Sequence, residues 1–124
     1  MQGHKSLRVF QLAYKLAMDI FRLTKNFPVE EKYSLTDQIR RSSRSVAANI
    51  AEGYRKRQYP NAFSNKMSDS DAEGGETQVW LEFSRDCGYI SPEVCEQMIK
   101  DYQEVGRMLG NMILHPKKFE PRQD

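Results

Sequence analysis

The stretch Gln38-Ile-Arg-Arg-Ser-Ser-Arg-Ser-Val-Ala-Ala-Asn-Ile-Ala-Glu-Gly-Tyr54 decides the fold, because it has the spacing of one amphipathic helix. Successive helical residues turn by about 100°. On that wheel one side carries the apolar side chains Leu35, Ile39, Val46 and Ile50. The opposite side, a sector of roughly 100°, carries Arg40, Arg41, Arg44 and Arg55. The apolar side needs partner helices, and the basic side needs water, acidic protein or phosphate.

The same periodicity predicts four helices, at about residues 7–26, 34–57, 61–87 and 92–114. Phe27-Pro28 ends the first helix, because a residue before proline avoids helical angles. Ser34 and Asp37 have the spacing of a capping box, Gly88 suits a left-handed C-cap, and Ser91-Pro92 is typical of a helix start. Short loops between such helices predict an all-α, antiparallel up-and-down four-helix bundle. We expect a single domain over residues 1–124 with a loose polar tail at 115–124.

The third helix has two stripes. The first is a predicted core face: Phe63, Met67, Ser70, Gly74, Thr77, Leu81 and Ser84. The second lies more than a quarter-turn away and holds Val79, Trp80, Phe83 and Cys87, with Asp69, Glu73 and Glu76 along its edge. One bundle core does not need this second stripe. We therefore expect an oligomer interface that includes Glu73, Glu76, Trp80 and Phe83.

Bulk properties narrow the class of protein. Net charge is +2, but residues 1–60 hold 12 Lys/Arg against 5 Asp/Glu, whereas residues 61–124 hold 7 against 12. This polarity suits either a nucleic-acid partner or attraction between the chain's own helices. No apolar run is long enough to span a membrane, and Lys15, Asp19 and Arg22 interrupt any signal-peptide core. Cys87 and Cys95 do not form a disulfide framework, so we expect reduced thiols and a cytoplasmic protein.

Enzymatic signatures are absent from the sequence. His4 and His115 lie near the chain ends without a Glu-x-x-His pair, and Gly74-Gly75 lacks the lysine and serine of a phosphate loop. We expect no enzyme activity, no cofactor and no metal. Two polar groups keep alternatives open. Asp69, Asp71, Glu73 and Glu76 suit a solvated face or contacts with arginines better than a divalent ion. Asn49 and Glu52 suit a structural cap or an interhelical hydrogen bond better than catalysis.

The basic stripe is the best functional candidate. Arg40, Arg41, Arg44 and Arg55, with Lys56 and Arg57 at the helix end, are predicted to contact the phosphates of a nucleic acid. Arginine suits this contact because its planar fork binds phosphate with two hydrogen bonds. Tyr54 and Tyr59 are placed to stack on bases. In a ring of identical subunits a weak patch is multiplied.

These residues form a pattern that resembles the four-helix-bundle family named after the 23S rRNA intervening-sequence protein. The similarity runs from Leu7 to about Ile113. It rests on the segments 27–41 (Phe-Pro to Gln-Ile-Arg-Arg), 45–53 (Ser-Val-Ala-Ala-Asn-Ile-Ala-Glu-Gly), 68–73, 76–81 and 87–90 (Cys-Gly-Tyr-Ile). Ala47 is a departure, because many relatives have proline there, and it puts only local helix geometry in doubt.

The resemblance implies a left-handed up-and-down bundle, commonly a homopentamer, without an assigned enzymatic activity. Some relatives are encoded inside insertions in ribosomal RNA genes. A related branch accompanies diversity-generating retroelements, where a basic pentamer is associated with a reverse transcriptase and nucleic acid.

The sequence as a whole leaves three hypotheses for the function. They are a homo-oligomer that binds RNA or DNA, a protein-interaction scaffold without a nucleic-acid role, and a carboxylate metalloenzyme that uses Asp69, Glu73 and Glu76.

Overall fold

Proline, glycine and serine divide the chain into helices close to the predicted ranges. The computed structural model describes residues 3–122. Its long helices are α1 (Arg8–Thr24), α2 (Leu35–Arg55), α3 (Pro60–Asp86) and α4 (Pro92–Leu114). Short 3-10 helices precede α1, join α1 to α2 and follow α4: η1 (Gly3–Ser6), η2 (Val29–Glu31) and η3 (Pro116–Phe119). Each predicted helix is confirmed, with bounds that differ by at most two residues.

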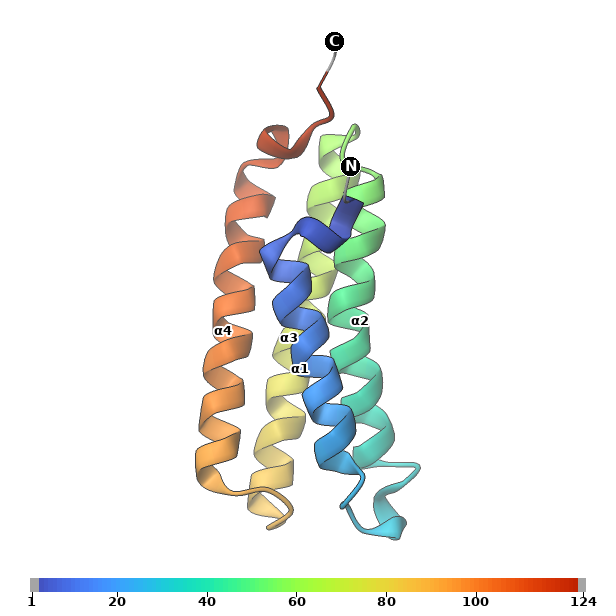
Figure 1. The fold of residues 1–124 in the computed structure, drawn as a ribbon, viewed down its shortest axis with the longest axis vertical. Helices are drawn as coiled ribbons and strands as arrows, with labels where there is room; N and C mark the ends of the chain where they lie inside the picture. Colours follow the sequence, from blue (N-terminus) through green and yellow to red (C-terminus); the bar gives the residue numbers. More distant parts are fainter. Residues whose placement is uncertain (1–2, 123–124) are drawn as a thin grey trace.

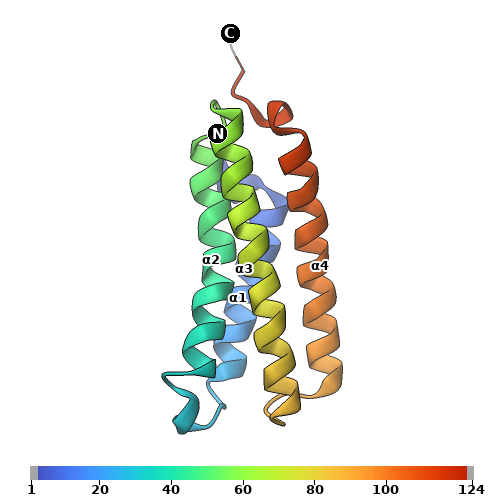
Figure 2. The same cartoon turned by 180° about the vertical axis from the view of Figure 1, so that it is seen from behind.

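The helices run alternately up and down and pack in chain order (Figure 1). α4 returns to α1 and closes the bundle. Viewed from the front and from behind, η1, the α2–α3 turn and η3 lie at one end, while η2 and the α3–α4 turn lie at the other (Figures 1 and 2). The predicted all-α, antiparallel up-and-down bundle is therefore confirmed. Within residues 3–122, every helix is too short or too polar to cross a bilayer.

The core consists of the predicted apolar faces. Every member of the first stripe of α3 is buried, and so are Leu35, Ile39, Val46 and Ile50 of α2. α4 buries Cys95, Met98, Tyr102, Val105, Leu109 and Met112. Two aromatic side chains, Phe63 and Tyr102, are among the largest fully buried groups. The Tyr102 hydroxyl has no hydrogen-bond partner among the described residues.

Small residues let α2 and α3 approach closely. A Cβ built on Gly53 would lie 2.6 Å from Met67 Cε and 2.8 Å from Lys66 Cβ. Buried hydroxyls tie the same seam, because Thr77 Oγ1 donates to Ser42 Oγ at 2.8 Å and Ser70 Oγ donates to the Val46 carbonyl at 2.7 Å. The small residues Ser42 and Gly53 of α2 therefore lie at the seam where α3 packs closely against this helix.

The start of α2 differs from the predicted capping box. Ser34 makes no cap hydrogen bond to Asp37; its hydroxyl donates to Glu31 Oε1 at 2.6 Å instead. Glu31 Oε1 also accepts from the Leu35 amide at 3.3 Å, and Glu31 Oε2 accepts from the Tyr89 hydroxyl at 2.8 Å. Glu31 therefore caps α2 and ties it to the α3–α4 turn. These three hydrogen bonds lower the pKa of the Glu31 carboxyl. The hydrogen bond to Glu31 raises the pKa of the Tyr89 hydroxyl to about 12.

The other helix ends follow the sequence pattern, except for the tail. Gly88 has a left-handed φ of 79°, and the Ser91 hydroxyl accepts from the Val94 amide at 3.1 Å. Both predictions are confirmed. The expectation of a loose tail is wrong for residues 116–119, which form η3. Phe119 stacks on Phe63 with 5.5 Å between ring centroids, so an apolar contact holds this segment against the bundle.

Candidate nucleic-acid interface

α2 carries Arg41, Arg44 and Arg55 of the predicted basic stripe on the side opposite its buried residues. Burial of Ile39, Val46 and Ile50 fixes the rotation of the helix, because each of these side chains is fully enclosed. Rotation in turn fixes the direction of each arginine. The six predicted cations nevertheless lie in different environments, and these environments decide which of them can meet an external anion.

Arg40 is used inside the protomer. Its Nε donates to Thr24 Oγ1 at 2.8 Å and its Nη2 donates to the Phe21 carbonyl at 3.4 Å. Its guanidinium carbon lies 4.9 Å from the centre of the Phe21 ring. The last carbonyls of a helix lack intrahelical partners, so Arg40 satisfies one of them at the end of α1. The expectation that its guanidinium faces outward is wrong, because α1 offers acceptors within reach.

Arg41 and Arg44 face solvent on the N-terminal half of α2. The side chain of Arg41 is 75% exposed, and its Nη1 lies 4.0 Å from Asp37 Oδ2. Arg44 is exposed, and its guanidinium carbon lies 5.8 Å from the centre of the Phe21 ring. An exposed ion pair at this distance contributes little to stability. Both guanidinium groups are therefore available to an anion outside the protomer.

A second group of cations lies at the C-terminal end of α2. Arg55 and Lys56 are exposed, and neither side chain pairs with any residue in the described part of the chain. The Arg57 guanidinium carbon lies 4.1 Å from the centre of the Tyr54 ring, and its Nη1 donates to the Tyr54 carbonyl at 3.0 Å. Tyr59 is 61% exposed. One face of the Tyr54 ring is thus already covered by Arg57, whereas the Tyr59 ring is open to solvent.

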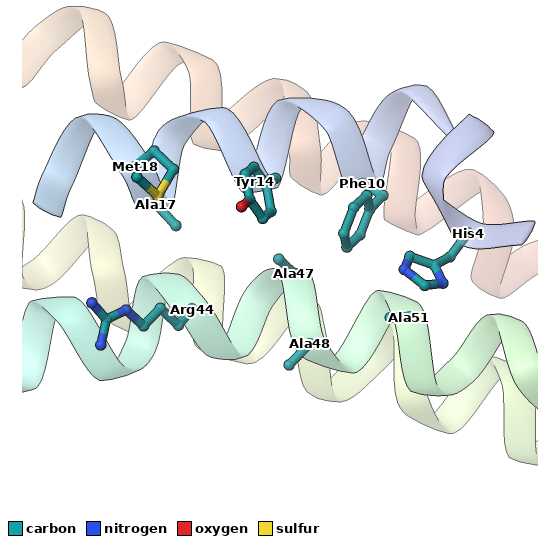
Figure 3. Close-up of a pocket in the computed structure, with 9 residues that line it drawn as sticks. All are labelled: His4, Phe10, Tyr14, Ala17, Met18, Arg44, Ala47, Ala48 and Ala51. Atoms are coloured by element: carbon teal, nitrogen blue, oxygen red, sulfur yellow. The ribbon is translucent and has the colours of Figure 1, made fainter.

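An apolar groove separates the two groups of cations. It lies between α1 and α2, has a volume of about 410 Å³ and is lined on the α2 side by Ala47, Ala48 and Ala51. Across it, α1 carries Phe10, Ala17, Met18 and the half-exposed Tyr14 (Figure 3). Arg44 stands at one end and His4 at the other (Figure 3). The basic stripe is therefore two clusters rather than a continuous row.

The predicted oligomer-interface residues line the exposed side of α3. Trp80 Nε1 donates to Glu76 Oε2 at 3.1 Å, and the Trp80 and Phe83 ring centroids lie 5.8 Å apart. Phe83 is 53% exposed and Val79 45% exposed. Exposed apolar groups gathered in one place mark interaction surfaces. We call Val79, Trp80 and Phe83, with Glu73 and Glu76, the α3 edge.

A charged groove of about 630 Å³ runs over the seam between α2 and α3. Arg41 and Arg44 line its α2 side, and Glu73 and Glu76 line its α3 side. Within residues 3–122 no ion pair crosses it. Opposite charges thus face one another across an open hollow without being neutralised.

Asn49 and Glu52 bridge α2 and α3 through Lys66. The Lys66 Nζ lies 2.9 Å from Glu52 Oε2 and donates to Asn49 Oδ1 at 3.4 Å, while Asn49 Nδ2 donates to the Ser45 carbonyl at 2.9 Å. The hydrogen bond from Lys66 lowers the pKa of the Glu52 carboxyl. The interhelical role expected for these two residues is confirmed.

The acidic residues of α3 are spread along the helix. In the described part of the chain, no three His, Cys, Asp or Glu side chains lie close enough to hold a metal ion. Asp69, Asp71 and Glu76 are exposed, and Asp71 lies beside Gly106 of α4. Cys87 and Cys95 are free thiols, and burial raises the pKa of Cys95.

The C-terminal segment adds cations that sequence reasoning left out. A groove of about 450 Å³ is lined by Tyr54 and Arg57 of the α2 end, Leu7, and the segment Lys118-Phe119-Glu120-Pro121-Arg122. Lys118 and Arg122 thus join the second cluster of α2. The available signal was Phe119, an aromatic residue inside an otherwise basic and polar tail.

Comparison with known proteins establishes the relationship of the chain. Residues 5–111 match the model of the 23S rRNA-intervening sequence protein family. The chain belongs to this family. A crystal structure of a protein with unknown function from the S23 ribosomal protein family of Bacteroides thetaiotaomicron VPI-5482 is similar, with 32% identity and a TM-score of 0.76. The similarity covers 85% of this chain and 97% of that chain.

No curated protein matches the chain significantly. The resemblance to the 23S rRNA-intervening sequence protein family is confirmed, and the matched range includes all six predicted cations of α2. It ends before Lys117, Lys118 and Arg122. The match to the family therefore does not extend to the C-terminal cations of this chain.

Proposed function

We propose that the chain is a non-enzymatic, homo-oligomeric helical bundle that binds RNA or DNA through the exposed cations of α2. The observation that carries the proposal is the exposure of Arg41, Arg44, Arg55 and Lys56, of which only Arg41 approaches a carboxylate among residues 3–122. Exposed arginines on a helix suit phosphate, because the planar guanidinium can donate two hydrogen bonds to one phosphate group. Arg40 supports the site from inside, by holding α1 against α2.

The spacing of the two clusters suits an extended polyanion. Arg44 and Arg55 are 11 residues apart, which is about 17 Å along a helix. Phosphates in one strand of B-DNA are spaced about 3.4 Å along the axis, so a strand parallel to α2 spans both clusters within about five nucleotides. The alanine-lined groove between the clusters is apolar and gives a side chain of a neighbouring subunit room to enter.

The homo-oligomer rests on two surfaces of different composition. The α3 edge carries aromatic and acidic side chains, whereas the α1–α2 groove is a hollow of alanines with Arg44 at its rim. Contact between two different surfaces is heterologous and closes into a ring when the rotation allows. We propose that successive subunits mate in this way to form a pentamer, the number that the resemblance implies. On the same resemblance we propose that the four-helix bundle is left-handed.

A second candidate function follows from the charged groove over α2 and α3. Arg41 and Arg44 face Glu73 and Glu76 without forming ion pairs in the described chain. A neighbouring subunit or another protein could neutralise both sides at once. In that case the chain is a protein-interaction scaffold whose arginines serve assembly.

Binding of a labelled RNA strand, measured by fluorescence anisotropy between 50 and 300 mM KCl, tests the proposal. We expect the logarithm of the binding constant to fall linearly with the logarithm of the KCl concentration. The slope of this line gives the number of phosphates that the protein neutralises. Multi-angle light scattering over the same salt range reports the assembly. Absence of RNA binding by an intact oligomer refutes the nucleic-acid function, and an oligomer that dissociates at high salt favours the scaffold.

A further inference from the structure

Charge is separated along the bundle axis, in addition to its separation between helices. We call residues 3–8, 54–62 and 113–122 the basic end; they contain eight Lys and Arg and a single Glu. The opposite end, residues 25–37 and 82–96, contains three Lys and Arg against seven Asp and Glu. The segments that make up each end lie together in space only because the helices alternate in direction (Figure 1). Neither end is evident from the difference between the two halves of the sequence.

Helix dipoles do not account for this polarity. α2 and α4 finish at the basic end, where cations such as Arg55 complement the negative ends of their dipoles. α1 and α3 start there, and the first turn of each lacks an acidic residue. α1 even begins with Arg8, and neither helix has a side-chain cap. Two positive and two negative dipole ends therefore meet at the basic end and largely offset one another, so its charge comes from the side chains.

Five of the eight cations of the basic end are free to meet a ligand. Within residues 3–122, no hydrogen bond or ion pair is made by the side chains of Arg55, Lys56, Lys117, Lys118 and Arg122. All five are exposed. Unlike Arg40, none is used to hold helices together. Within residues 3–122, no ion pair offsets their mutual repulsion.

Aromatic rings lie among these cations. The groove of about 450 Å³ is lined by Tyr54 and Phe119 together with Lys118 and Arg122. Phe119 is anchored on Phe63, and Tyr59 is exposed in the turn between α2 and α3. Cationic side chains interleaved with aromatic rings are typical of surfaces that bind single-stranded nucleic acid, since phosphates meet the charges and bases stack on the rings.

We infer that the basic end is the principal binding site for a single strand of RNA or DNA, with a base at the Tyr54–Phe119 groove and phosphates on Lys117, Lys118 and Arg122. This inference rests on the proposed nucleic-acid function and relocates its centre from the side of α2 to the end of the bundle. Arg55 and Lys56 belong to both surfaces. Arg41 and Arg44 then lie outside the main contact.

Three double variants of the full chain, each removing two positive charges, test the location. Lys117→Gln with Lys118→Gln changes the basic end, Arg41→Gln with Arg44→Gln changes the side of α2, and Lys25→Gln with Lys32→Gln changes the opposite end. The probe is a fluorescein-labelled 20-nucleotide oligouridylate, followed by anisotropy at several KCl concentrations. We expect the basic-end variant to bind about tenfold more weakly and its logarithmic salt slope to fall by about 1.4. The other two variants should change affinity less than about threefold.

The outcomes separate the two proposals. If the wild-type chain does not bind the probe, the proposed function fails and this inference fails with it. If the Arg41/Arg44 variant loses binding while the Lys117/Lys118 variant keeps it, the proposed function stands and the inference is overturned. Displacement of the probe by phosphatidylserine vesicles at equal phosphate concentration would also overturn it, because the end would then recognise an anionic membrane surface. A Lys117/Lys118 variant whose oligomer dissociates without loss of probe binding would overturn it in favour of contacts between copies.

Discussion

Gly53 marks the closest approach of α2 and α3, and its replacement by alanine tests how tightly this seam is built. The added Cβ would lie 2.6 Å from the Met67 methyl and 2.8 Å from Lys66 Cβ. The Met67 methyl can rotate away, but Lys66 Cβ is attached to the α3 backbone. Relief of the second contact therefore requires the two helices to separate.

The magnitude follows from two opposing terms. Alanine in a helix interior is favoured over glycine by about 1 kcal/mol. Overpacking of a tight interior costs about 1–3 kcal/mol. We expect Gly53→Ala to lower the free energy of unfolding by about 1 kcal/mol net, which lowers the melting temperature by about 4 °C in a domain of this size.

Gly75→Ala is the matched control. Gly75 is exposed in the interior of α3, and no atom lies within 4 Å of its added Cβ. Only the helix-propensity term operates there, so we expect the melting temperature to rise by about 4 °C. Thermal and urea unfolding followed by circular dichroism measure both variants. If Gly53→Ala stabilises the protein as much as Gly75→Ala does, the close-approach argument is refuted.

Three further predictions concern single side chains. Arg40→Gln should lower the free energy of unfolding by about 1–2 kcal/mol, because it removes hydrogen bonds to the end of α1, whereas Arg41→Gln should change it by less than about 0.5 kcal/mol; equal urea midpoints would contradict this. Tyr102→Phe removes a buried, unpartnered hydroxyl and should raise the free energy of unfolding by up to about 1 kcal/mol, while a loss would indicate a bridging water. Glu31→Gln should lower the melting temperature at pH 7, because a carboxyl whose pKa is lowered by folding stabilises the fold at pH values above its unfolded pKa. The difference in melting temperature from wild type should shrink as the pH falls below about 4. A difference that stays constant with pH would exclude the ionised carboxyl as its source.

The fold was predictable because each helix buries a stripe with helical periodicity. The seven residues of the core stripe of α3 were all placed correctly, polar Ser70, Thr77 and Ser84 included, since position on the wheel decides burial more strongly than polarity does. Gly88 and Ser91 were predictable because their conformations depend on adjacent residues alone. Local chemistry and periodicity thus determine the helices, their bounds and their inward faces.

Contacts between distant segments were the part that sequence reasoning missed. Ser34 turned to Glu31 rather than Asp37, and Arg40 turned inward to Thr24 and the Phe21 carbonyl. Phe119 fixed the tail on Phe63, which is more than 50 residues away. A helical wheel gives the direction of a side chain but not the acceptors on the neighbouring helix. The axial separation of charge was missed for the same reason, because it depends on which ends the topology brings together.

The residues that most clearly mark the family are mainly occupied by the fold. Arg40 caps the C-terminal end of α1, and Asn49 and Glu52 interact with Lys66 through a hydrogen bond and an ion pair. Gly53 lies where α3 packs too closely for a larger side chain. A match at these positions therefore establishes the bundle and carries little information about a ligand. The exposed cations, by contrast, contribute almost nothing to packing, so substitutions there leave the fold unchanged. Function in this family should accordingly be sought in the charge of the α2 surface and of the bundle end, where relatives can differ while keeping the same core.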